Sequence, residues 1–476
     1  MKKNFLKIVT IAVLFAVITS VMTACNNQGE SSNPDLSSQI SESTSEVPSQ
    51  PAEEVRDFEN AEFVIGSHWA RAIFPEVGES EYGDKILARY SEIEEKYNCR
   101  ITYKEGTPEE FVNGVSTSIA AGLKYADVIE SNLWWYNSFL TAGYLEPLDD
   151  IEDMKIEDEM WLSLAKTATE FRGKTYGFDW TTWYYRIPHI YYILYFNKNI
   201  LEQKNQPDPY ELFEQGQWNW ETFREILKNT TDPANEIDGL VGLDRHFEMS
   251  AIRSNGAREV NISQDGIYTF GLQDERAYEA LEYVRDIINI DKSYGDYYDG
   301  RSAGVDWTIP ISKFRDGNAA FMIYHTHVLE FKGFLDAMPD DYGVIPFPRG
   351  PKGESDYNSA ITGDTRVFSI PVTTDDKDMA GFIMRQIAQP LAGSSADDWK
   401  NSAKRIYFRD DKGFDHYLKS VEFADRDYFE AYGVINFGET INALLSVTRD
   451  QSASPAQAMG RIRSAMQQEL EDAFNN

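Results

Sequence analysis

The chain has 476 residues, of which 42% are hydrophobic, and 78 acidic against 45 basic side chains give it a formal net charge of −33. This length exceeds one ordinary domain, and the hydrophobic content is enough for packed cores, which excludes a chain that is disordered throughout. The negative charge argues against nucleic acid or an anionic bilayer as a binding partner, because both repel a polyanion.

The first 24 residues have the pattern of an export signal. A basic start, MKKNFLK, precedes IVTIAVLFAVITSV, an apolar run that is short for a membrane-spanning helix. The run ends in MTAC, which resembles a bacterial lipobox, where the signal is cleaved before the Cys and the thiol is lipidated. We therefore predict a lipoprotein signal peptide over 1–24 and lipidation at Cys25; the alternative is an ordinary cleavage site beside a chance Cys.

A tether is predicted to follow the lipidated cysteine. Residues 25–56 are rich in Ser, Glu and Pro and have few apolar side chains, so they cannot bury enough surface to offset the entropy of ordering. The second cysteine, Cys99, lies in the strand-like run CRITY and is expected to be buried and inert. With Cys25 lipidated, the chain has no internal disulfide, and its stability must come from its core.

The folded part opens with strands and helices in alternation. Strands are expected over 62–69, 99–105 and 126–131, and helices at KILARYSEIEEKYN and after Thr107, whose capping box is completed by Glu110. This order predicts a parallel sheet with crossover helices, which binds ligands beyond the carboxyl ends of its strands. Aromatic side chains stand at two of those ends: His68 and Trp69, and Trp134 and Trp135. We expect one ring of the tandem Trp pair to pack in the core and the other to face a ligand.

Further elements follow in chain order. The Trp- and Tyr-rich segment 173–201 lacks a helical period and is predicted to cross between two lobes in an extended form. Further elements are expected as helices from Asn219, over 274–290 and from Pro455, a helix-to-strand turn over 314–327, and a second crossing at DYGVIPFPRGPKG, 341–353.

The ordered set of phrases resembles one family. ADVIESNLWWYNSFLTAGYLEPLDD, GKTYGFDW, YYILYFNKNIL, FRDGNAAFMIYHTH and SPAQAMGRIRSAM occur in the order found in extracellular solute-binding proteins of ABC importers, family 1, the group of maltose-binding protein. The resemblance implies an α/β, two-lobe periplasmic-binding-protein-like fold of type II, in which each lobe is a mainly parallel sheet flanked by helices and a hinge joins the lobes. It places lobe 1 at 58–178 plus about 347–380, and lobe 2 at 179–346 plus much of 381–476.

The resemblance also implies a ligand and partners. A carbohydrate, expected to be an oligosaccharide, would be captured by closure of the cleft and delivered to ABC permease subunits in the membrane. The chain would be a monomer that is lipid-anchored on the extracytoplasmic face of the cell membrane. The expected ligand-binding residues are Trp134, Trp135, His68, Trp69, Trp180, Trp183, His327, Asp364 and Arg366. His327 stands near a position where many sugar binders have Trp.

Several alternatives to a carbohydrate-binding importer component are open. His325 and His327 would share one side of a strand, but two His are a weak metal signal, so neither a metal nor a cofactor is predicted. No G-x-S-x-G, H-E-x-x-H, C-x-x-C or Walker motif supports an enzyme, although a glycosidase pair of carboxylates stays open among 78 acidic residues. The main alternative is the same architecture binding a peptide or a charged small solute. A signalling or adhesion lipoprotein without an importer is a further alternative.

Overall fold

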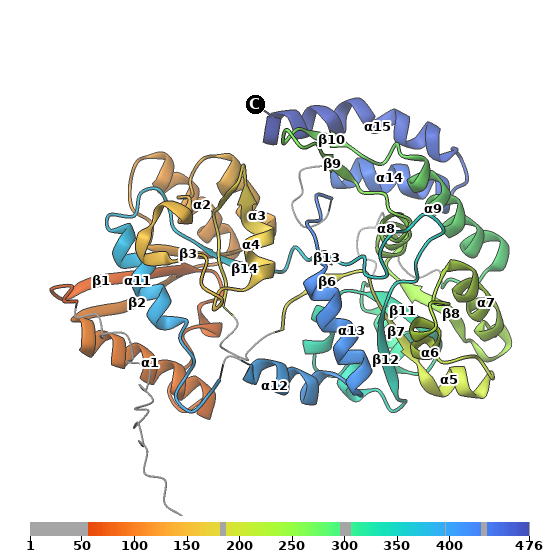
Figure 1. Cartoon of the computed structure of the whole chain (residues 1–476), viewed down its shortest axis with the longest axis horizontal. Helices are drawn as coiled ribbons and strands as arrows, with labels where there is room; N and C mark the ends of the chain where they lie inside the picture. The colour runs from red at the N-terminus through yellow and green to blue at the C-terminus, as the bar shows by residue number, and fades with distance from the viewer. Residues whose placement is uncertain (1–55, 181–186, 296–305, 396, 430–435, 476) are drawn as a thin grey trace, which may run out of the picture. The chain divides into compact units, whose positions relative to one another are not determined.

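The computed structural model describes residues 56–180, 187–295, 306–395, 397–429 and 436–475 (Figure 1). They belong to one compact unit, 55–476. The predicted signal peptide, the lipidation site at Cys25 and the tether up to residue 55 lie outside the described residues, as does Trp183. Within the described ranges, no helix has the length and apolar character needed to cross a membrane.

The first sheet has four strands in the order β14-β3-β1-β2. β1 (Ala61–Ser67) pairs in parallel with β2 (Cys99–Glu105) and with β3 (Val128–Asn132), as the sequence predicts. β14 (Arg366–Ser369) returns from far along the chain and pairs antiparallel with β3. The carboxyl ends of β1 and β3 and the start of β14 therefore lie at one edge of this sheet, because Arg366 is paired with Asn132.

Helices cover both faces of the first sheet (Figure 1). α1 (Glu81–Tyr97) packs its buried stripe against Phe63 and Ile65 of β1, whereas α2 (Pro108–Ala120) packs on a different core cluster that contains Ile129 of β3. The predicted capping box of α2 is confirmed, with the Thr107 and Glu110 side chains each bonded to the other's backbone N–H. After β3 the chain forms α3 (Leu133–Thr141), α4 (Ser163–Thr169), β4 (Glu170–Phe171) and β5 (Lys174–Thr175), and after β14 it forms α11 (Lys377–Ile387).

The second sheet has the order β12-β7-β11-β8 and corrects two predictions. β7 (Ile193–Asn197) is antiparallel to both of its neighbours, β11 (Ala319–Tyr324) and β12 (Tyr342–Pro346), and only β8 (Asp238–Gly242) pairs in parallel, so this sheet is not mainly parallel. The second crossing predicted over 341–353 is wrong for its first half. Residues 342–346 form the fully buried edge strand β12, which ends at Pro346, and the passage toward β14 begins only after it.

Two short strands pair in the passages that connect the sheets along the chain. β6 (Ile190–Tyr191) comes just before β7, and β13 (Ala360–Ile361) comes just before β14; the two pair antiparallel. The prediction for His325 and His327 also needs a correction. β11 ends at Tyr324, and His327 lies in a 3-10 turn, η6 (Thr326–Glu330), so the two imidazoles do not share one side of a strand.

The helices around the second sheet include those predicted from periodicity and capping. α7 (Trp220–Thr230) starts after the Asn219 cap, α9 (Glu275–Asp286) after Asp274, and α15 (Pro455–Leu470) after Ser454. The other helices are α5 (Lys198–Gln203), α6 (Pro209–Glu214), α8 (Asp244–Ser254), α10 (Ile309–Arg315), α12 (Asp398–Tyr407), α13 (Asp411–Glu422) and α14 (Phe437–Thr448). Strands β9 (Val260–Ile262) and β10 (Tyr268–Phe270) form a hairpin. Short 3-10 or π turns are η1 (Ala70–Ala72), η2 (Leu148–Asp150), η3 (Glu152–Met154), η4 (Pro233–Asn235), η5 (Ile287–Asp291), η7 (Leu335–Ala337) and η8 (Glu471–Asn475).

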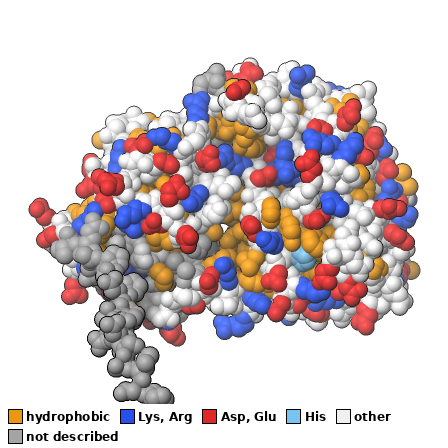
Figure 2. All heavy atoms as spheres, viewed as in Figure 1, with side chains coloured by type: hydrophobic (Ala, Val, Ile, Leu, Met, Phe, Trp, Pro, Cys, Tyr) orange, Lys and Arg blue, Asp and Glu red, His pale blue; other side chains and the backbone are white. Residues whose placement is uncertain are grey.

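Acidic and basic side chains are mixed on the surface. Figure 2 shows Asp and Glu side chains spread over the visible face, with Lys and Arg side chains among them. Local ion pairs also form among exposed residues, such as Lys174 with Asp150 and Lys419 with Glu422. Exposed pairs of this kind contribute little to stability.

Candidate ligand-binding site

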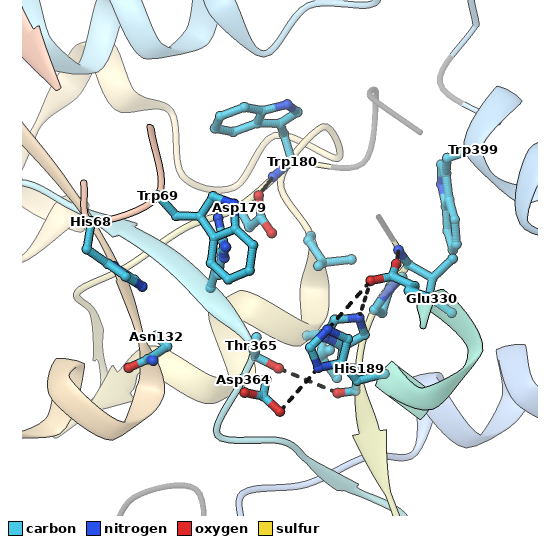
Figure 3. A pocket seen from close by; sticks show the side chains of 16 residues that line it. His68, Trp69, Asn132, Asp179, Trp180, His189, Glu330, Asp364, Thr365 and Trp399 are labelled. Atoms are coloured by element: carbon cyan, nitrogen blue, oxygen red, sulfur yellow. Dashed lines mark hydrogen bonds and ion pairs between the residues drawn. The ribbon is translucent and has the colours of Figure 1, made fainter. Parts of the chain in front are cut away.

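A pocket lies where segments from the first sheet meet segments that precede and follow strands of the second (Figure 3). Six of the nine residues predicted to bind ligand line it: His68, Trp69, Trp180, His327, Asp364 and Arg366. Trp134 and Trp135 do not line it, and Trp183 lies outside the described residues. Contact with a ligand stays a prediction for each of them.

Trp69 is held at the pocket by a polar chain that runs back into the sheet. Its backbone N–H donates to the Ser67 hydroxyl at 2.9 Å, and that hydroxyl donates to Glu130 at 2.7 Å. The other oxygen of Glu130 accepts from Arg366 at 3.1 Å, and the Arg366 guanidinium lies over the Trp69 ring, 4.3 Å from its centroid. Although this cation–π contact occupies part of the ring, 54% of Trp69 remains exposed, so it is the most accessible aromatic surface of the pocket.

His68 links the pocket to the core of the first sheet. Its ring packs edge-on against Trp135, with 4.6 Å between centroids, and at a tilt against Phe111, with 5.8 Å between centroids. Burial, with a further contribution from the nearby charge of Arg366, lowers the pKa of His68, although Glu130 and Glu105 oppose the shift. The His68 ring is therefore neutral at pH 7. Trp135 is the core-packed ring of the tandem pair and supports a pocket residue from behind.

Trp134 has a different environment from its neighbour. It is 44% exposed in α3, which begins directly at the end of β3. A Cβ placed on Gly363 would lie 1.9 Å from the Trp134 Nε1 atom, so the indole packs directly on the backbone of the segment that carries Asp364. One ring of the pair is thus packed and the other exposed, but the exposed one lies next to the pocket rather than in its lining.

Two further indoles form apolar walls. Trp180 is buried against Phe368, with ring centroids 4.7 Å apart, and Trp399 of α12 is also buried. Both line the pocket with the small part of their surface that is not packed. Asp179 stands beside Trp180 and accepts a bond from its backbone N–H at 2.9 Å. The pocket therefore combines aromatic faces with carboxylates, which is the composition of a site for a polar ligand with apolar faces.

Imidazoles and carboxylates gather at one end of the pocket (Figure 3). His189 and His327 stack with 4.4 Å between their ring centroids. Glu330 Oε2 lies 3.2 Å from His189 Nε2 and 4.0 Å from His327 Nε2, and Asp364 Oδ2 lies 3.4 Å from His327 Nδ1. Burial by itself would raise the pKa of Glu330 and of Asp364. The neighbouring histidines outweigh burial and lower the pKa of both carboxyls, so both are ionised at pH 7.

Sequence reasoning missed several lining residues. Asn132, which caps α3, and Asp179, which adjoins Trp180, both stand beside residues that were predicted, so their position at a strand end or crossing was a usable signal. His189 also lies in the predicted crossing, 173–201, and so had the same signal. Glu330 and Trp399 carry no such signal, since they meet the pocket only through the fold. The others are Leu162, Leu164, Ile187, Pro188 and Thr365.

Comparison with known proteins identifies the family. Residues 76–381, more than half of the chain, match the family described as bacterial extracellular solute-binding protein. No curated protein sequence matches the chain.

Solved structures share the fold at low sequence identity. A cyclo/maltodextrin-binding protein complexed with maltotetraose has a TM-score of 0.60 and 14% identity, over 88% of this chain and 99% of that one. An ABC substrate-binding protein from Listeria monocytogenes in complex with cycloalternan has a TM-score of 0.57 and 14% identity, over 86% and 98%. The GacH receptor of Streptomyces glaucescens, solved unliganded and with acarbose, has a TM-score of 0.56 and 16% identity, over 87% and 99%.

These likenesses show the fold, which is the two-lobe, type II arrangement of ABC substrate-binding proteins. Members of this family are binding proteins rather than enzymes. By the match over 76–381, the chain belongs to the bacterial extracellular solute-binding proteins.

Proposed function

We propose that this chain is the substrate-binding lipoprotein of an ABC transporter and captures an extracellular carbohydrate, an oligosaccharide, in the pocket around Trp69. One observation carries the choice of ligand. The 54% exposed indole of Trp69 stands in one pocket with carboxylates, an amide and Arg366.

The chemistry of a neutral sugar fits this composition. Its C–H faces pack on aromatic rings, and its hydroxyls donate to carboxylates and accept from guanidinium and amide N–H groups. An indole buries on the order of 150–250 Å², which supplies several kcal/mol before the costs of ordering are subtracted. Three solved relatives in the same fold hold maltotetraose, cycloalternan or acarbose, and this also supports a carbohydrate here.

Capture would proceed by a shift of population. A ligand that touches both lobes stabilises the closed form over the open one, in proportion to its differential contacts. In this proposal lobe 1 contains β1, β2, β3, β14 and α11, and lobe 2 contains the second sheet with α12 to α15. The paired strands β6 and β13 belong to the hinge.

The closed form would then deliver the carbohydrate to membrane permease subunits. Lipid attachment at Cys25 would hold a monomeric receptor on the extracytoplasmic face of the membrane, with the Ser- and Pro-rich segment up to residue 56 as its tether. Support comes from the lipobox-like MTAC and from the family match.

Thermal unfolding tests the ligand class. Residues 26–476, which contain the compact unit, are heated with a panel of oligosaccharides, then with peptides and charged solutes. We expect one oligosaccharide class to raise the melting temperature, because a ligand that binds only the folded form stabilises it. A response confined to peptides or charged solutes would keep the architecture and overturn the carbohydrate assignment. Hydrolysis of an oligosaccharide would instead indicate an enzyme.

A further inference from the structure

Two imidazoles and one carboxylate converge at one end of the pocket. His189 immediately precedes β6, and His327 and Glu330 both lie in η6. Each of the three offers one ligand atom, and these atoms all lie within 4.8 Å of one another. Glu330 Oε2 faces the Nε2 atoms of both histidines. Glu330 is fixed by its other oxygen, Oε1, which accepts the Ile187 backbone N–H at 3.0 Å.

We propose that His189, His327 and Glu330 bind a divalent transition-metal ion, of the Zn²⁺ or Co²⁺ class, in the solute pocket. Two imidazoles with one carboxylate form a common three-ligand set for such ions, which leaves a further coordination position open. All three residues line the pocket, so that position is open to water or to an oxygen atom of a bound solute.

The distances suit this class of ion. Ligand atoms held tetrahedrally at about 2.0–2.1 Å from a metal lie about 3.4 Å from one another. Glu330 Oε2 lies 3.2 Å from His189 Nε2 and 4.0 Å from His327 Nε2. The two imidazole rings stack with 24° between their planes, so one ring must rotate before both ring lone pairs point at a single ion. Ca²⁺ and Mg²⁺ prefer sites made of oxygen atoms only, and the two imidazoles disfavour them.

Asp364 provides a second, independent feature of a metal site. Its carboxylate lies 3.4 Å from His327 Nδ1, the ring nitrogen opposite the proposed ligand atom. A metal-binding imidazole commonly donates its other N–H to a carboxylate, which fixes the tautomer and orients the lone pair toward the metal.

An alternative set shares His327. His325, His327 and Asp364 also offer three ligand atoms within 4.8 Å of one another. That set requires the Nδ1 atom of His327, which faces Asp364, and it leaves Glu330 and His189 joined only by their hydrogen bond. We assign the metal to the first set because there Asp364 acts as the orienting partner.

Metal binding is tested on the full chain purified in detergent and stripped with a chelator. Titration with Zn²⁺ and with Co²⁺ is followed by calorimetry and by the absorption of bound Co²⁺. We expect one ion per chain. Binding should be lost in His189→Gln and in Glu330→Gln, should be about 10- to 100-fold weaker in Asp364→Asn because only the orienting partner changes, and should be unchanged in His416→Gln, a histidine outside the pocket.

A measurement on the unaltered chain covers the case in which a variant does not fold. The chain has six histidines, and Zn²⁺ should shift the imidazole resonances of two of them, while Mg²⁺ should shift none. Absence of binding, or binding that His189→Gln and Glu330→Gln leave unchanged, would overturn the proposal. Loss in His325→Gln with retention in His189→Gln would overturn this ligand set in favour of the alternative. No sugar enters these experiments, so they stand or fall separately from the carbohydrate assignment.

Discussion

Arg366 at the start of β14 and Glu130 on β3 form an ion pair across neighbouring strands, with 3.1 Å between Nη1 and Oε1. Glu130 is only 1% exposed, and its second oxygen accepts from Ser67 at the end of β1. The same guanidinium covers part of the Trp69 ring. One buried carboxylate thus ties the end of each of three strands to the pocket's most exposed aromatic side chain.

The first prediction concerns this pair. Arg366→Met should lower the free energy of unfolding by about 3–5 kcal/mol, because it leaves a charged carboxylate buried without its cation. Urea unfolding measures the loss. Arg366→Met combined with Glu130→Gln should recover most of it, since the buried charge is then removed as well. If the double variant is as unstable as the single one, the pair is not the source of the loss.

The second prediction concerns the contact of Trp134 with Gly363. Gly363→Ala should cost about 1–3 kcal/mol of stability, because the new methyl group overlaps the indole and forces it to move. Adding Trp134→Ala should relieve the cost, which a double-mutant cycle of urea unfolding will show as coupling. The matched control is Gly460→Ala in α15, where nothing lies within 4 Å of the added Cβ; it should stabilise by about 0.5–1 kcal/mol. Additive effects at 363 and 134 would contradict the packing described.

The third prediction is a pH dependence from His416. Its ring packs on Phe213 and Tyr210, and burial lowers its pKa to about 4 from an ordinary 6.5 despite the opposing charges of Asp415 and Asp410. Between these two values the unfolded chain binds the proton more readily than the folded one, so stability falls as pH falls from 6.5 toward 4. The contribution reaches about 3 kcal/mol.

His416→Phe should flatten this slope, since the variant has no proton to bind and keeps an aromatic ring in the same place. Urea midpoints at about pH 5 and about pH 7.5 give the slope. A variant with the same slope as the unaltered chain would show that other groups cause the pH dependence.

The fourth prediction concerns the lipid anchor. Cys25→Ser should move the exported protein from the detergent phase to the aqueous phase, because the lipid can no longer be attached. Cys99→Ser is the matched control and should leave partitioning unchanged, since Cys99 is buried and burial raises the pKa of its thiol to about 11. An aqueous chain before any substitution would contradict the lipoprotein assignment.

Sequence reasoning recovered the first sheet well because its signals are local. The apolar run of 61–67, the capping box at Thr107 and the Asn219 cap each depend on a few adjacent residues. The second sheet was harder to predict. Strand β12 contains Pro and Gly and was interpreted as part of a crossing, and the antiparallel direction of β7 is set by partners more than a hundred residues away.

The pocket residues divide in the same way, into those that a local sequence signal identifies and those that only the fold brings together. Trp69 and His68 follow a recognisable strand end, so sequence could point to them. The turn η6 carries both His327 and Glu330, and His189 is held beside them because the Ile190 N–H of β6 donates to the Thr326 hydroxyl of η6. Without these neighbours, two histidines spaced i, i+2 gave only a weak signal. The tandem Trp pair was correctly divided into a packed ring, Trp135, and an exposed ring, Trp134. The exposed ring lies beside the pocket, where its indole packs on the backbone at Gly363.

The measurement that tests the central claim most directly is calorimetric titration of residues 26–476 with the oligosaccharide that gives the largest thermal shift, for Trp69→Ala against Trp307→Ala. The two indoles are similarly accessible, at 54% and 43%, but only Trp69 lines the pocket. We expect Trp69→Ala to weaken binding at least about 10-fold, which corresponds to about 1.4 kcal/mol, because the sugar loses its most exposed aromatic surface. Trp307→Ala should leave the affinity unchanged. Equal affinities in both variants would contradict carbohydrate capture in this pocket.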